Sequence, residues 1–299
     1  MKEVDDIQDD EIRIIGEQVK KDRGNSGFEK KYLRIGLLIA GGVLVALLFF
    51  WLGMREEFRS EEEVGTTEQH VRPNNLPANM ASLIQPVDSV VHGYTDVQDT
   101  VVNDIPMSIY IPYGAEPSLY VGRLNWDDTS IIYATWAADI RADNQKIVGA
   151  FILNGEPLSW GKAKKGYCAI IEGKMTIGVQ ENTALFEEAI QKKGDFFRQY
   201  PLVDQGQLVE NRPKGKAVRR ALCELGGGIF VIVETQTRES FHDFSQALVD
   251  LGVWNAIYLV GTSEIWGGYT DKNNQRIFFT DVENPAGEYI NYIVWRRKN

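Results

Sequence analysis

The chain has 299 residues, of which 43% are hydrophobic and 25% are charged. This ordinary globular composition excludes wholesale disorder, a collagen-like repeat and a membrane protein with many spans. Its 32 Lys and Arg are outnumbered by 42 Asp and Glu, which gives a formal net charge of -10, and no long basic run occurs. We therefore expect no nucleic-acid partner.

Residues 35–54 form an uncharged stretch, IGLLIAGGVLVALLFFWLGM, bracketed by Arg34 and Arg55. At about 1.5 Å rise per residue, a helix of this length spans about 30 Å, which is the thickness of the hydrocarbon core of a bilayer. The stretch therefore predicts a single transmembrane helix that contacts the lipid bilayer.

The charges around this stretch predict its orientation. Six cations lie shortly before it, whereas only Arg55 and Arg59 follow it closely, among several glutamates. The positive-inside rule then makes residues 1–34 a cytoplasmic tail and puts the main domain in the periplasm or outside the cell, anchored in the cell inner membrane. Residues 55–80 are charged and then rich in Asn and Pro, which indicates a stalk, and residues 81–299 form the remaining domain.

The two cysteines, Cys168 and Cys223, leave two alternatives open. In an oxidising compartment they form a disulfide if their strands are neighbours, or else they are two small buried side chains that never meet. We expect no metal site, because no Cys/His ligand spacing occurs. We also expect no cofactor. The glycines at 226–228 lack the Lys and Ser or Thr of a phosphate-binding loop and are predicted to form a hairpin turn.

From about Val101 onward, short segments rich in β-branched and aromatic residues alternate with Pro, Gly and Asp turns, which predicts strands. Two segments have helical spacing instead. One is capped by Thr183, and the other begins at Ser240, with Asp243 three residues later, and stops at Gly252. We therefore expect an α+β domain with a mixed or mostly antiparallel sheet and a few helices.

Three stretches, taken together, resemble the phosphodiester glycosidase family. Residues 134–158, ATWAADIRADNQKIVGAFILNGEPL, look like the family's ATNAGMF segment and the Asn-Gly turn after it. FRQYPLVDQGQLV followed by RRALCEL is similar to its second block, and residues 240–264 resemble its helix, the next strand and an Asp-Gly turn. The resemblance covers most of residues 100–270 and implies hydrolysis of the bond between a sugar's anomeric carbon and a phosphodiester oxygen.

Carried over residue by residue, the resemblance gives an incomplete catalytic set. The family's Asn is Trp136 here, its Asp is Val260 and its last Ser is Glu264, whereas an arginine, Arg219, and the turn glycine Gly261 match. A valine cannot donate, accept or carry charge, so the usual chemistry cannot run at Val260. The resemblance thus implies a family member that is degenerate at its motif positions.

Three functional hypotheses follow, of which the last is a subunit of a complex whose cytoplasmic tail and membrane anchor matter more than any pocket. In the first, the protein is catalytically degenerate and binds an envelope glycan, a phospho-sugar or an envelope protein partner. The residues that would contact the ligand are Arg219, Gly261, Thr262 and Trp266. In the second, the protein is an active hydrolase with a displaced catalytic set. That set is Arg219, Glu264 and Asp139, and its side chains should converge in one place.

Other side chains keep two interpretations. The strand VRRALCEL places Arg219 and Arg220 on opposite faces, so one arginine points to an apolar side and needs a carboxylate or phosphate partner. Arg219 is either an anion ligand or part of an ordinary salt bridge. Several aromatic side chains either stack on sugar rings or fill the core: Trp136, Trp160, Trp266 and Tyr269.

Overall fold

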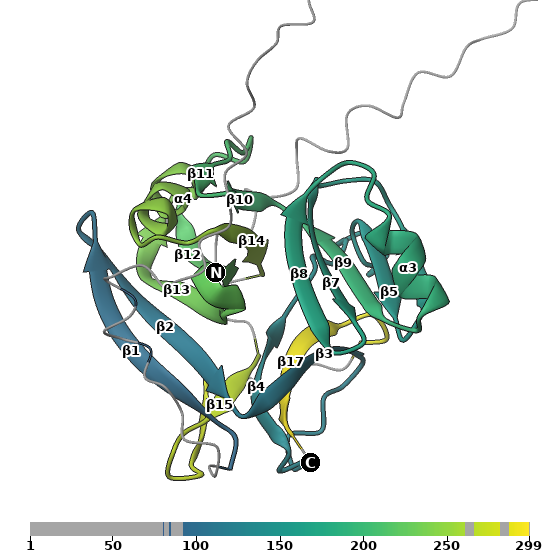
Figure 1. The fold of residues 1–299 in the computed structure, drawn as a ribbon, viewed down its shortest axis with the longest axis horizontal. Coiled ribbons are helices and arrows are strands. Elements are labelled where there is room, and N and C mark those ends of the chain that lie inside the picture. Colours follow the sequence, from purple (N-terminus) through teal and green to yellow (C-terminus); the bar gives the residue numbers. More distant parts are fainter. Residues whose placement is uncertain (1–79, 81–83, 85–91, 261–265, 282–286, 299) are drawn as a thin grey trace, which may run out of the picture. The chain divides into compact units, whose positions relative to one another are not determined.

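The computed structural model describes residues 80, 84, 92–260, 266–281 and 287–298, all of which belong to one compact unit, residues 71–299 (Figure 1). The predicted cytoplasmic tail, the predicted transmembrane helix at 35–54 and all of the stalk except Met80 lie outside these residues. Among the helices that the structure describes, none has the length and apolar character needed to cross a membrane.

The described part of the chain is built from antiparallel β-sheets, so the predicted α+β class is wrong. Every strand pairing within it is antiparallel, with no parallel or mixed sheet. The same residues contain two α-helices, α3 (Leu185–Gln191) and α4 (Phe241–Asp250), and one 3-10 turn, η1 (Gly226–Gly228). The helices are short and the strands dominate.

Tight turns explain the antiparallel pairing. Four hairpins reverse through two residues that both have positive φ, as in type I′ turns. These turns are Asn103–Asp104, Asn154–Gly155, Glu172–Gly173 and Gln205–Gly206. Such a turn brings the next strand back beside the last one, whereas a parallel neighbour needs a crossover of about a dozen residues or more. The turn chemistry therefore selects the sheet type.

Both predicted helices are confirmed. Ser240 caps α4, because its hydroxyl accepts a hydrogen bond from the Asp243 N–H at 3.0 Å, and the chain leaves the helix at Gly252 with φ of 89°. The first turn of α3 follows Thr183, whose hydroxyl accepts from the Leu185 N–H at 3.3 Å. The predicted cap at Ser240 is confirmed, whereas the N-cap of α3 is Ala184, which makes no side-chain cap hydrogen bond, so apolar spacing was the useful signal for α3.

The largest sheet has seven strands in the order β1-β2-β13-β12-β14-β10-β11. Its strands are β1 Tyr94–Val102, β2 Ile105–Tyr113, β10 Pro201–Asp204, β11 Gln207–Leu208, β12 Ala217–Glu224, β13 Phe230–Glu239 and β14 Asn255–Leu259. Figure 1 shows β1 and β2 as a long hairpin at its edge. Both faces of β14 are buried and its sequence is apolar after Asn255, whereas β12 carries Arg219, Arg220 and Glu224 into a mostly buried strand.

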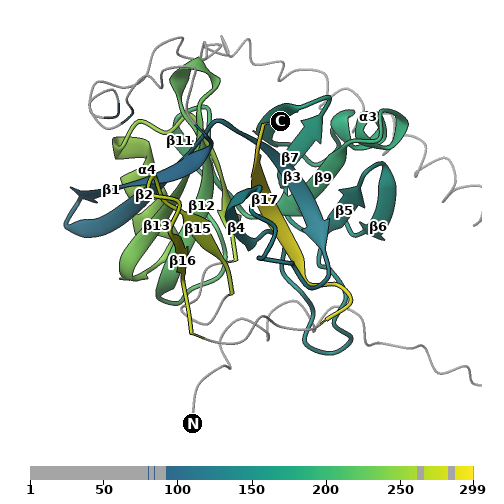
Figure 2. The same ribbon diagram turned by 90° about the horizontal axis from the view of Figure 1, so that it is seen from below.

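Two five-stranded sheets complete the fold. The second sheet has the order β16-β15-β4-β17-β3, and Figure 2 shows β4, β17 and β3 side by side. Its strands are β3 Ala115–Val121, β4 Ile131–Trp136, β15 Gly268–Thr270, β16 Arg276–Phe278 and β17 Asn291–Arg297. The third sheet has the order β6-β5-β9-β7-β8. Its strands are β5 Ala150–Leu153, β6 Glu156–Trp160, β7 Gly166–Ile171, β8 Lys174–Val179 and β9 Asp195–Gln199.

Hydrophobic clusters lie on both sides of the large sheet. The α4 core lies on one face and includes Phe244, Leu248, Ala221, Cys223 and Tyr258. The central core lies on the other face and joins all three sheets. Its members include Tyr110, Tyr133, Phe151, Phe197, Leu222 and Ile293. Smaller clusters lie under α3 and around the tryptophans of the second sheet.

A buried carboxylate links the second and third sheets. Asp195, at the start of β9, accepts the Leu119 N–H of β3 and the Asn154 N–H of the β5–β6 turn, both at 2.8 Å. Burial raises the pKa of Asp195, while the two amide hydrogen bonds act in the opposite direction. The carboxylate thus satisfies two backbone donors that lie in different sheets.

We predict that Asp195→Ala lowers the free energy of unfolding by roughly 2 to 4 kcal/mol, because it leaves two backbone N–H groups without an acceptor. Urea denaturation of both proteins measures the difference. Asp127→Ala is the matched control, since its carboxylate is 99% exposed, and it should change the stability little. Equal midpoints for Asp195→Ala and the wild type would refute the role of Asp195.

Candidate functional site

The β12–β13 hairpin sets the register of the candidate site. The predicted glycine turn at Gly226–Gly228 is confirmed as the connection between these strands, and the Leu225 N–H donates to the Ile229 carbonyl at 2.8 Å. From this turn the register pairs Glu224 with Phe230 and Arg220 with Glu234. A cation and a carboxylate are therefore placed opposite each other, directly beside the apolar pairs Ala221–Val233 and Leu222–Ile232.

A β-bulge follows directly on this pair. Between Arg220↔Glu234 and Val218↔Arg238, β13 contains two more residues than β12. The Arg219 backbone N–H donates to the Thr235 hydroxyl at 2.9 Å, so a side-chain oxygen takes the place of the backbone carbonyl that would accept it in a regular ladder. Bulges re-aim side chains and are frequent beside functional sites. The two arginines stand at such an irregularity.

Arg220 faces the central core and is 2% exposed. Its guanidinium donates to the Glu234 carboxylate through Nε, forms an ion pair with it through Nη2, and donates to the Thr135 hydroxyl through Nη1. It also lies 4.5 Å from the ring centroid of Phe279. Burial lowers the pKa of Arg220, but the charge of Glu234 raises it and prevails, so Arg220 remains a cation.

Arg220 and Glu234 belong to a row of side chains that crosses the large sheet. The register aligns Asp99 of β1, Ser108 of β2, Glu234 of β13, Arg220 of β12 and Leu259 of β14. At the exposed end of this polar row, the Ser108 hydroxyl donates to Asp99 at 2.7 Å, and the Gln236 amide donates to both at 3.0 Å. The row thus runs from solvent at β1 to a buried cation at β12.

Tyrosines surround the buried end of the polar row. Burial and the charge of Glu234 raise the pKa of Tyr110, and burial raises the pKa of Tyr133 well above its ordinary value. The Tyr133 side chain is fully buried, and its hydroxyl has no hydrogen-bond partner among the described residues. Both phenols stay protonated at neutral pH, so Glu234 is the carboxylate that neutralises Arg220.

Arg219 points to the opposite face, as the strand alternation predicts. Its Nε donates to the Glu239 carbonyl at 2.9 Å and its Nη2 donates to the Gly215 carbonyl at 2.6 Å. The guanidinium lies 4.1 Å from the ring centroid of Phe241 and 5.9 Å from that of Tyr258. Arg219 is thus held by backbone oxygens and aromatic rings rather than by a carboxylate.

Asp139 forms an ion pair with Lys164, whose ammonium lies 4.6 Å from the ring centroid of Tyr200. The Tyr200 ring is 5.4 Å from that of Phe241, on which Arg219 stacks. Arg219 and Asp139 are therefore connected only through intervening rings and Lys164. Glu264 lies outside the described residues, so convergence of the complete displaced set stays a prediction.

The family position Trp136 and the ligand candidate Trp266 lie in or against the tryptophan cluster. This cluster includes Trp126, Trp266 and Tyr292, and Trp136 packs beside it opposite Tyr292 in the β4–β17 register. Trp266 is 6% exposed and contacts Trp126 edge to face, with ring centroids 5.7 Å apart. Trp266 is therefore a buried packing residue. Val260 is half-buried directly after β14, and Gly261 and Thr262 lie outside the described residues.

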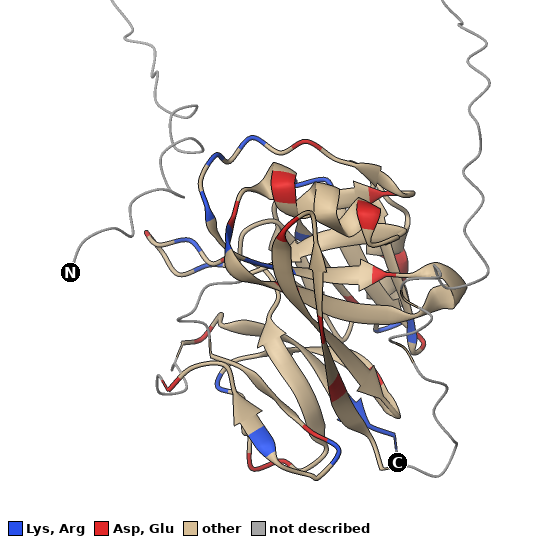
Figure 3. Cartoon of the chain, turned by 90° about the vertical axis from the view of Figure 1, so that its left-hand side faces the viewer, with Lys and Arg blue, Asp and Glu red and all other residues tan. Residues whose placement is uncertain are grey.

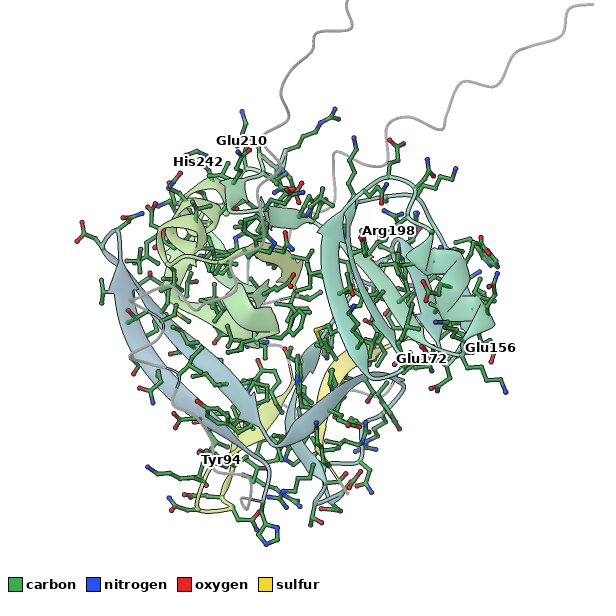
Figure 4. The ribbon with its side chains drawn as sticks, in the orientation of Figure 1. Tyr94, Glu156, Glu172, Arg198, Glu210 and His242 are labelled. Atoms are coloured by element: carbon green, nitrogen blue, oxygen red, sulfur yellow. The ribbon has the colours of Figure 1, made fainter. Side chains whose placement is uncertain are left out.

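Cys168 and Cys223 are free thiols, so they are two separate buried side chains and do not form a disulfide. Cys168 belongs to the central core and Cys223 to the α4 core, on opposite sides of the large sheet. His242 is exposed in the first turn of α4, where its Nδ1 is 2.8 Å from the Glu210 carboxylate (Figure 4). The described residues include no group of three or more His, Cys, Asp or Glu side chains suited to a metal ion.

Sequence reasoning missed the Arg220–Glu234 pair, although a signal was present. The alternation already required a carboxylate partner for one arginine. Counting outward from the glycine turn pairs residue 224 with 230 and therefore 220 with 234, and GIFVIVET has its only acidic residue there. The hairpin register was sufficient to identify Glu234.

No protein-family profile matches the chain, and no curated protein matches it. Solved structures do resemble it. The zebrafish N-acetylglucosamine-1-phosphodiester alpha-N-acetylglucosaminidase catalytic domain, auto-inhibited by its pro-peptide, has a TM-score of 0.50 and 11% identity, covering 72% of this chain and 86% of that one. A hypothetical protein from Synechocystis has a TM-score of 0.48 and 14% identity, covering 68% and 62%. The first likeness indicates a distant fold relationship and nothing about activity.

We predict that Glu234→Ala lowers the free energy of unfolding by roughly 3 to 5 kcal/mol, because it leaves the Arg220 charge buried without a counter-charge. Replacing both partners, by Arg220→Met with Glu234→Leu, should recover much of this loss, since no buried charge remains. Denaturant unfolding of the single and double variants gives the comparison.

Glu210→Ala is the matched control, because it removes an exposed carboxylate from an exposed partner and should change stability little. A double variant no more stable than Glu234→Ala would show that the pair does not act as a buried charge unit.

Proposed function

We propose that this chain is a glycosidase-fold protein that has lost hydrolytic chemistry and binds a glycan or phospho-sugar. The fold likeness to a catalytic domain that acts on a sugar phosphodiester supports the sugar part of the proposal. The observation that carries the loss of chemistry is that Arg220, the buried arginine on the central side of β12, is neutralised by Glu234 within the fold.

Hydrolysis of a glycosyl phosphodiester places charge on the departing phosphate, so a catalyst needs a cation aimed at that group and an acid or base near the sugar. In this chain the candidate cations have internal partners. Arg220 pairs with Glu234, Lys164 with Asp139, and Arg219 donates to backbone carbonyls. A phosphate would have to displace one of these partners before the charge of Arg220, Lys164 or Arg219 became available to it.

Replacement of the family's polar residues supports the same conclusion. Val260 and Trp136 occupy positions where the family resemblance requires Asp and Asn, and neither replacement can transfer a proton. Binding needs less than catalysis, because it requires only matched contacts with the ligand's ground state. Loss of chemistry with retention of binding is therefore the function that these residues support best.

A second candidate function is hydrolysis by a different displaced set, Arg220 with Glu234. The observation that favours it is the position of Glu234, whose side chain is 18% exposed while Arg220 beside it is 2% exposed. A carboxylate at the rim of a buried cation is a plausible acid or base if ligand binding separates the pair. The same assay distinguishes the two functions.

We expect no release of free sugar from N-acetylglucosamine-1-phosphodiesters by the full-length protein. Enzymes accelerate their reactions by about 10⁶-fold or more, so even a weak hydrolase would stand clear of the spontaneous rate. The assay follows the release of reducing sugar over time. The Arg220→Met/Glu234→Leu double variant is the matched protein control. Turnover by the wild type that is lost in Glu234→Gln would overturn the proposal and establish the second candidate.

A further inference from the structure

Two loops carry cations without acids, although the chain as a whole is acidic. The first basic loop, residues 161–165, reads GKAKK, and the second basic loop, residues 211–216, reads NRPKGK. Neither contains Asp or Glu, whereas the whole chain has a net charge of -10. Figure 3 shows Lys and Arg in blue on loops between the strands. Such local reversal of charge marks a surface suited to an anionic partner.

The two basic loops flank the same short segment of chain. The Lys164 ammonium of the first loop lies over the Tyr200 ring. The Asn211 amide of the second loop donates to the carbonyl of the next residue, Pro201, at 2.7 Å. Tyr200 and Pro201 are adjacent, so both loops meet at the junction of β9 and β10. The two basic loops are therefore anchored at the same short stretch of chain.

Most of these cations lack a strong internal partner. Lys162, Arg212 and Lys214 form no ion pair with any carboxylate in the described ranges. Lys165 lies 4.0 Å from Glu181, but both side chains are about two-thirds exposed, so this pair is weak. In contrast to Arg220 and Lys164, these charges are available to a ligand.

An exposed tryptophan adjoins the first basic loop. Trp160 ends β6 directly before Gly161 and is 65% exposed, while its ring contacts Phe186 of α3 at 5.5 Å between centroids. A large aromatic face held in place yet open to solvent suits the C–H face of a pyranose. Its position beside lysines points to a ligand that has both sugar rings and negative charge.

A buried arginine contacts the backbone of the first basic loop. Arg198 of β9, labelled in Figure 4, is 5% exposed and donates to the carbonyls of Lys164 at 3.2 Å, Gln180 at 2.9 Å and Glu181 at 2.7 Å. A buried guanidinium thus ties the Lys164 carbonyl of the loop to the backbone that follows β8. Pre-ordering of this kind reduces the entropy lost when the loop binds a ligand.

We propose that Trp160 and the exposed cations of the two basic loops bind an anionic glycan chain, with the indole stacked on a sugar ring and the cations on its phosphate or carboxylate groups. This inference rests on the proposed sugar-binding function and names its ligand class. It uses none of the residues around Arg220, so the site is separate from the polar row.

The experiment measures binding of the full-length protein to polygalacturonate, which carries carboxylates, to a sugar-phosphate polymer and to neutral dextran. Both anionic polymers should bind at low ionic strength and weaken with added salt, and dextran should not bind. Lys162→Gln/Arg212→Gln/Lys214→Gln should lower the affinity for anionic polymers by about tenfold or more, because the attraction is electrostatic. Trp160→Ala should also lower the affinity for both anionic polymers, because it removes the stacking surface.

Matched controls keep the test specific. Lys174→Gln/Lys272→Gln removes two exposed lysines outside the basic loops, one at the start of β8 and one in a turn, and Phe278→Ala removes an aromatic ring that is 47% exposed on another sheet. Neither control should change the affinity. The inference would be overturned if the triple variant bound the anionic polymers as tightly as the wild type, or if dextran bound equally well. It would also be overturned if single-stranded DNA bound as tightly as the glycans and Trp160→Ala had no effect. Detection of hydrolysis would overturn the proposed function but leave this site standing.

Discussion

A guanidinium inside an apolar core must find its counter-charge there, and this constraint shapes the centre of the protein. Arg220 lies where all three sheets contribute side chains, and the hairpin register supplies Glu234 as its partner. The Thr135 hydroxyl of the second sheet accepts a further hydrogen bond from it. One buried cation therefore joins two sheets and, by the same contacts, is kept from an incoming anion.

Local signals predicted much of the fold. The cap at Ser240, the stop at Gly252 and the glycine turn at residues 226–228 depend on neighbours in sequence, and all three are confirmed. The α+β class was wrong because the two described helices are short, whereas antiparallel strands dominate the described residues. Asn154–Gly155 and Asn103–Asp104 adopt two-residue turns that allow only antiparallel neighbours. The predicted transmembrane helix lies outside the described residues.

The site was predicted less completely, because its decisive contacts cross long distances in sequence. Alternation correctly placed Arg219 and Arg220 on opposite faces, but family resemblance favoured Arg219. Arg219 stacks on Phe241 of α4, a contact that only tertiary packing creates. Trp266 was expected at a ligand, yet it is buried edge to face against Trp126. Side-chain type alone does not separate a binding aromatic from a packing one.

The central claim is that the charge of Arg220 is already neutralised inside the fold. The most direct measurement is a crystal structure of the protein soaked with N-acetylglucosamine 1-phosphate. The account predicts that Arg220 keeps its contacts with Glu234 and Thr135 and that no phosphate oxygen lies against its guanidinium. A phosphate bound to Arg220, with Glu234 turned away, would contradict the account.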